Sequence, residues 1–242
     1  MTLSKEEQHS QKEFDDLLLR IFVNEFEEQK ALAMAKGGMQ LETKEAFCSK
    51  RTMELEKAID QSREKLVNGF RAFIKKTGEI PEIIPLFKKF QNNIEENENI
   101  TSEVENTQKK SFQEIFEIND DDFLILYNIA CEELNKTHYE IASDMFNFLS
   151  WLNPQIYLSM MNFGLAESLQ GHHDVAKEIY ETCLKVFPTV HLLHLYAADN
   201  YCLMKEKDKA KELLEQCVTL ATAANDTNCL LQAEKLKVKL SF

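Results

Sequence analysis

The sequence predicts an all-α protein whose C-terminal half repeats one pair of helices. Two prolines, Pro154 and Pro188, lie 34 residues apart, and the residues around them repeat at the same interval. The 242 residues include only 4 prolines and 6 glycines, so few positions force a helix to end. Few stretches alternate between apolar and polar residues, and β-branched residues are sparse. These observations favour long helices over strands.

The interval defines three consecutive units, at about 123–156, 157–190 and 191–224. Each unit has small residues where its two helices cross and larger ones that fill the gap to the next unit. The matching residues are Leu126, Ile129, Ala130, Ala142, Phe146 and Pro154, then Met160, Phe163, Gly164, Ala176, Tyr180 and Pro188, then Ala197, Ala198, Tyr201, Ala210 and Leu214, with Thr222 in place of a proline. This period is typical of the tetratricopeptide (TPR) repeat.

The register predicts where the helices of the TPR domain, residues 111–242, begin and end. The expected repeat helices are 122–135, 139–152, 156–169, 173–186, 190–203 and 207–220. A short helix at 111–116 precedes them, and a final helix at 226–240 covers the apolar end of the stack, as an array of repeats requires. One residue of the segment 119–122 is expected to cap the first repeat helix, because the segment lacks the glycine and the twelfth-position glutamate of a calcium loop.

Residues 1–110 are expected to form a helical N-terminal extension, either a helical hairpin or a coiled coil. Apolar residues at intervals of three and four predict helices at 12–35 and about 43–76, separated by Gly37 and Gly38. The polar stretch 95–110 is the expected domain boundary. Three roles are open for this extension: it packs on its own domain, it binds a partner, or it joins two copies of the chain in a homodimer.

Composition narrows the classes of partner. The net charge of −13 disfavours nucleic acid and anionic membranes. Six cysteines form no CxxC pair, and residues 1–10 lack the apolar segment of a secretory leader, so we expect reduced thiols in a cytoplasmic protein. No apolar run approaches the roughly 18 residues of a membrane span.

The first helix of each unit should line the concave surface of the array, and its exposed positions are mostly apolar. Those positions hold Leu124, Tyr127, Cys131, Leu134 and Asn135, then Leu158, Met161, Leu165, Ser168 and Leu169, then Leu192, Leu195, Asp199, Cys202 and Leu203. Such a groove suits an extended or helical apolar peptide. The alternative is that these side chains pack under the N-terminal helices or the last helix. None of these groove positions holds a lysine or an arginine, which argues against a clamp for a peptide's carboxylates.

No enzyme constellation is recognisable, and we expect neither a catalytic residue nor a cofactor. His172 and His173 lie at a turn without an HExxH motif or a cysteine pair nearby. His191 and His194 share one helix, but no third metal ligand is indicated. The sequence therefore predicts no metal site. Asp199, the one charged groove position, either anchors a basic residue of a partner or faces water.

Residues 112–220 resemble the TPR class of type III secretion chaperones, the SycD/LcrH-like class II proteins. The resemblance rests on the segments 112–121, 126–130, 138–142 and 148–154, together with three repeats and a closing helix. It implies a chaperone from a bacterial cytoplasm, with no catalysis. It also implies that Tyr127 and Tyr139 line the ligand pocket, where Cys131 and Leu134 depart from the usual aromatic residues.

The expected function is therefore to bind an apolar segment of a secreted translocator in the groove and keep that protein soluble before export. The alternative is a general TPR scaffold for protein–protein interaction whose groove is occupied by its own N-terminal helices.

Overall fold

The computed structural model describes residues 64–80, 83–89 and 111–240, and every regular element in these ranges is helical. The chain divides into two compact units, Met1–Phe123 and Leu124–Phe242. The expected helix 12–35, the first part of the helix 43–76 and the connector 95–110 lie outside the described residues. The domain boundary predicted near residue 110 stays a prediction. Within the described ranges, no helix is long and apolar enough to cross a membrane.

The described part of the first unit contains helical segments at 64–76 and 84–89, and α5 (Phe112–Ile115). Phe70 and Phe87 pack edge to face with their ring centroids 5.3 Å apart. Ser111 caps α5, since its hydroxyl accepts the Glu114 amide and its own amide donates to the Glu114 carboxylate at 2.7 Å. This reciprocal pair is a capping box, which fixes the start of a helix too short to be stable alone.

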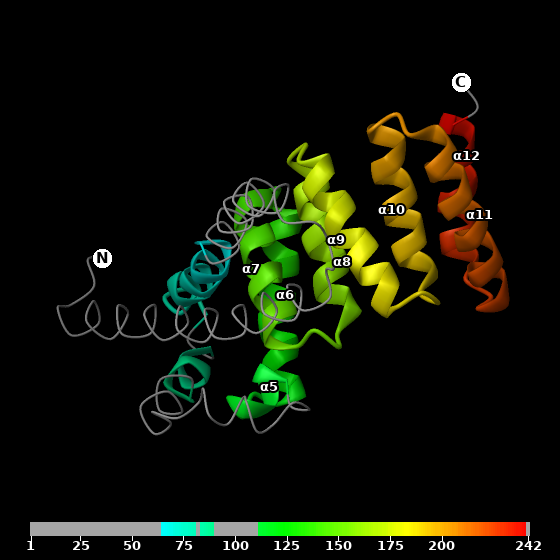
Figure 1. Cartoon of the computed structure of the whole chain (residues 1–242). Helices are drawn as coiled ribbons and strands as arrows, with labels where there is room; N and C mark the ends of the chain where they lie inside the picture. Colours follow the sequence, from blue (N-terminus) through cyan, green and yellow to red (C-terminus); the bar gives the residue numbers. More distant parts are fainter. Residues whose placement is uncertain (1–63, 81–82, 90–110, 241–242) are drawn as a thin grey trace, which may run out of the picture. The chain divides into compact units, whose positions relative to one another are not determined.

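From residue 120 onward the chain is a succession of helices, the first of which begins four residues before the second unit (Figure 1). They are α6 (Asp120–Asn135), α7 (Tyr139–Leu152), α8 (Tyr157–Leu169), α9 (His173–Val186), α10 (His191–Leu203), α11 (Lys207–Ala223) and α12 (Thr227–Leu240). The predicted all-α helix pairs are confirmed at their predicted places. The Asn119 side chain accepts the Asp122 amide at 2.8 Å, which confirms a cap in the acidic segment.

Prolines decide where the second helix of a pair stops. α7 and α9 each have 14 residues and end just before Pro154 and Pro188. α11 runs for 17 residues, to Ala223, because Thr222 stands where the proline would be. The predicted end of this helix at residue 220 was therefore too early.

The first helix of each pair ends with the same backbone geometry, which recurs at the repeat interval. Thr137, Gly171 and Lys205 have positive φ angles of 63°, 84° and 65°. The amide of the next residue in each case donates to the carbonyl five residues back, at 2.9–3.0 Å. This is the Schellman pattern, which satisfies the last helical carbonyls and reverses the chain.

Two close contacts hold the array together. The backbone of α8 crosses α9 where Gly164 faces the ring of Tyr180, which is 1% exposed. At the end of the array, α12 packs on α10 and α11, and Cys229, Ala233 and Leu236 are buried there. The closing helix is therefore present as predicted.

Candidate peptide-binding groove

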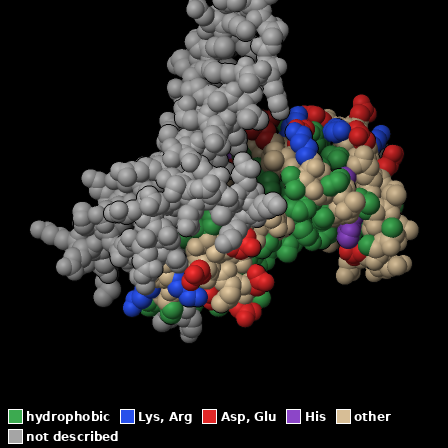
Figure 2. Space-filling model, turned by 60° about the horizontal axis from the view of Figure 1, so that its bottom comes forward, with side chains coloured by type: hydrophobic (Ala, Val, Ile, Leu, Met, Phe, Trp, Pro, Cys, Tyr) green, Lys and Arg blue, Asp and Glu red, His purple; other side chains and the backbone are tan. Residues whose placement is uncertain are grey.

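The expected groove residues differ widely in exposure. Leu124 is 53% and Leu169 is 47% exposed, whereas Met161 and Leu195 are each 5% exposed. The others are half-buried: Tyr127, Cys131, Leu134, Tyr139, Leu158, Leu165, Leu192 and Asp199. Hydrophobic side chains gather on part of the face shown in Figure 2. Leu124, Leu169 and Leu203, the last 51% exposed, are thus the groove leucines with the most apolar surface left to bury.

Tyr127 and Cys131 on α6 meet Asn162 on α8. The Asn162 amide donates to the Tyr127 hydroxyl at 2.8 Å and lies 4.0 Å from the Cys131 sulfur. The Tyr127 ring also packs edge to face on Phe146, with centroids 5.8 Å apart. Burial raises the pKa of Tyr127, so its hydroxyl stays protonated and can donate. The Tyr127 side chain is therefore held in place by a buried amide, which no hydrophobic pattern could reveal.

Met161 lies in the core between the second and third helix pairs. It forms a buried cluster with Cys183 and Leu193, and Leu158 and Leu192 pack against this cluster from the partly exposed side. Met161 therefore lies beneath the expected groove surface, and the partly buried Leu158 and Leu192 pack over it.

The third helix pair is partly covered by α12. Leu195 belongs to the buried cluster that contains Ala233 and Leu236 of α12. Asp199 forms an ion pair with Lys239 at 3.5 Å, and both side chains remain largely exposed. An exposed pair of this kind contributes little stability. The alternative that the last helix covers some of these side chains thus applies to Leu195.

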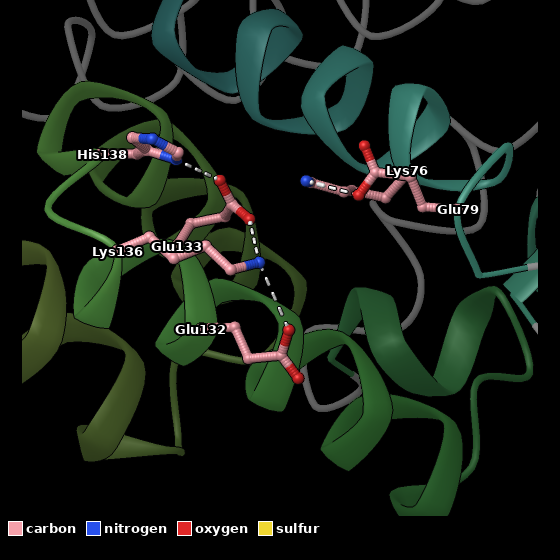
Figure 3. A network of polar contacts seen from close by, with 6 residues as sticks. All are labelled: Lys76, Glu79, Glu132, Glu133, Lys136 and His138. Carbon is pink, nitrogen blue, oxygen red and sulfur yellow. Dashed lines mark hydrogen bonds and ion pairs between the residues drawn. The ribbon is translucent and has the colours of Figure 1, made fainter.

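A buried glutamate and an exposed histidine recur at the repeat interval, a pairing that was not predicted from the sequence. The Glu133 carboxylate, on a residue 2% exposed, lies 2.8 Å from His138 Nδ1 and 3.3 Å from Lys136 Nζ (Figure 3). One interval later, the Glu167 carboxylate lies 3.0 Å from His172 Nδ1 and accepts the Ser143 hydroxyl. The signal was readable as Glu-x4-His spaced by 34 residues. Each pair fixes the turn between two helices, because the buried carboxylate is paired across it.

A second polar contact joins the second and third pairs. Asn200, 1% exposed, accepts the Ser168 hydroxyl at 2.9 Å and donates to the His173 carbonyl at 2.9 Å. The Ser168 proton points to Asn200, although His173 Nδ1 lies 3.4 Å away. The contact therefore joins α8, α9 and α10 rather than activating Ser168 as a nucleophile.

No protein-family model matches the sequence, and no curated protein matches it. Solved structures do match. The type III secretion translocator chaperone SycD of Yersinia enterocolitica is 20% identical, with 55% of this chain and 97% of that chain covered and a TM-score of 0.50. A type III secretion system complex from Aeromonas hydrophila is 15% identical, with 58% and 93% covered and a TM-score of 0.52.

The repeat region has the fold of a translocator chaperone. The likeness covers nearly all of the SycD chain and a little over half of this one. The resemblance inferred from the sequence is thus confirmed at the level of the fold. It covers a part of the chain only, as the residues 112–220 had indicated.

Proposed function

We propose that this protein is a cytoplasmic chaperone of a bacterial type III secretion system. It binds an apolar segment of a secreted translocator on the concave surface of the array and keeps that protein soluble before export. The single observation that supports this proposal most is the shared fold of the repeat region and SycD, which is itself a translocator chaperone.

The exposed leucines support the same proposal. Leu124 and Leu169 leave about half of their surface in water although they lie on the helices α6 and α8 that face the groove. Covering a leucine side chain fully is worth about 1.5–3 kcal/mol. A ligand that covers both half-exposed side chains therefore gains the binding free energy of about one fully buried leucine. Each 1.4 kcal/mol of that free energy corresponds to about a tenfold gain in affinity.

The test compares one leucine variant with a matched control in the full-length protein. Leu169→Asp places a charge in the groove and should weaken retention of a translocator, co-expressed from the same secretion system, by at least about tenfold. Val186→Asp changes another largely exposed apolar residue, 60% exposed against 47% for Leu169, at the end of α9, and should retain the translocator.

Equal retention by wild type and Leu169→Asp would contradict the groove as the binding surface. Failure of the wild type to retain any translocator, while the melting temperature is normal, would contradict the chaperone function. In the second case a general scaffold whose groove holds its own N-terminal residues becomes the better interpretation, and deletion of residues 1–63 should then open the groove to partners.

A further inference from the structure

Three groups that bind metals converge at the C-terminal end of the array. His191 is the first residue of α10, Asp226 directly precedes α12, and Cys229 lies in the first turn of α12. Their ligand atoms all lie within 4.8 Å of one another. The sequence alone indicates no third ligand beside His191, because Asp226 and Cys229 come 35 and 38 residues later.

We propose that His191, Asp226 and Cys229 bind one divalent cation of the zinc class. An imidazole, a carboxylate and a thiolate are the three side-chain ligands that zinc accepts. Magnesium and calcium prefer oxygen ligands alone, so the thiol argues against them. This site does not depend on the proposed function.

Side-chain movements alone would bring the three ligand atoms to the separations that zinc requires. His191 Nε2 lies 2.9 Å from the nearer Asp226 carboxylate oxygen, Oδ2. Tetrahedral zinc with ligands at about 2.0–2.3 Å separates a nitrogen and an oxygen ligand by about 3.3 Å, and a nitrogen and a sulfur ligand by about 3.6 Å. The imidazole and the carboxylate would therefore open by about 0.4 Å, and the Cys229 sulfur, within 4.8 Å of them, would approach by up to about 1.2 Å. The ion would replace the hydrogen bond between these two groups.

Neighbouring contacts orient the ligands. The other Asp226 oxygen, Oδ1, accepts the Cys229 amide at 3.0 Å, which directs Oδ2 to His191. Cys217 Sγ lies 3.5 Å from Cys229 Sγ, so the Cys217 thiol can donate to a Cys229 thiolate. Contacts of this kind orient metal ligands, and their loss usually lowers the affinity for the metal by about 10–100-fold. On binding, the Cys229 proton passes to solvent and the Cys229–metal bond forms.

The test is a titration of the chelator-treated, full-length protein with Co²⁺, a spectroscopic substitute for zinc. The wild type should bind one equivalent with a sulfur-to-cobalt charge-transfer band, and Zn²⁺ should displace the cobalt. Cys229→Ser should lose the band. His191→Ala, at a partly exposed position, should weaken binding by at least about 10–100-fold. The matched control is Cys183→Ser, which alters another fully buried thiol of the array and should keep both the band and the affinity.

A second readout is thermal. Zinc should raise the melting temperature of the wild type and leave that of His191→Ala unchanged, because an ion that binds only the folded state stabilises it. A wild-type titration without the sulfur band overturns the proposal, and so does a band that survives in Cys229→Ser. In either case His191 and Asp226 form an ion pair at the start of α12 and nothing more.

Discussion

Gly164→Ala tests whether helix crossing in the second pair depends on the absence of a side chain. A Cβ at this position would lie 2.7 Å from Cε1, 2.9 Å from Cζ and 3.1 Å from Cδ1 of Tyr180. Carbon atoms prefer about 3.5–4.0 Å. The Tyr180 ring is 1% exposed and belongs to a buried cluster, so it has little room to retreat.

Two effects of opposite sign set the magnitude. Overpacking a buried site costs about 1–3 kcal/mol. Alanine favours a helix over glycine by about 1 kcal/mol. The net free energy of unfolding should therefore fall by about 1 kcal/mol, which lowers the melting temperature of a protein of this size by about 2–4 °C.

The matched background is Tyr180→Leu. One interval later the corresponding positions hold Ala198 and Leu214, a pairing of alanine with a smaller partner. Leucine at 180 removes Cε1 and Cζ, so Gly164→Ala in that background should stabilise the protein by about 1 kcal/mol through helix propensity. Thermal and urea unfolding of the four proteins measure the coupling, expected at about 1–3 kcal/mol. An equal loss from Gly164→Ala in both backgrounds would refute the steric explanation.

Two further predictions concern buried groups. Glu167→Ala should lower the free energy of unfolding by about 1–3 kcal/mol, because it leaves the buried Ser143 hydroxyl without its acceptor, whereas Ala in place of the exposed Glu178 should change it by less than about 0.5 kcal/mol in the same urea assay. Burial raises the pKa of the Cys183 thiol to about 11, above its unfolded value, so this neutral thiol stabilises the fold below about pH 8.5 and loses that effect as the pH rises toward 11. Cys183→Ala should therefore melt with a shallower dependence on pH between about 9 and 11, and an unchanged slope would contradict this account.

The repeat interval gave correct bounds for most helices because helix ends are decided locally. A proline beyond the first turn or a residue with positive φ ends a helix locally, and Pro154, Pro188 and Gly171 can be read directly from the sequence. The end of α11 was predicted too early because Thr222 stands where a proline would end the helix, so α11 continues to Ala223. The small residue at Gly164 was likewise predicted at a crossing, and its close contact with Tyr180 agrees.

The state of the groove residues could not be predicted in this way. The sequence placed Met161, Leu195 and Leu169 on one surface, yet only Leu169 is well exposed. Leu195 is buried because α12 packs over α10, and Met161 is buried because the second and third pairs close around it. A period assigns a residue to a face of its helix, but it does not say which later element covers that face.

By itself, the sequence determined the helical class, the repeat length, the crossing residues and the resemblance to the translocator chaperones. These follow from short-range rules of helix propensity, turn geometry and side-chain size that act within one or two units. Only the tertiary structure decided which leucines remain open, which glutamates are buried with a histidine, and that His191 meets Asp226 and Cys229. Those outcomes depend on contacts distant in the sequence, such as Ser143 with Glu167, 24 residues apart, and His191 with Asp226, 35 residues apart, because such partners are set by how whole helices pack.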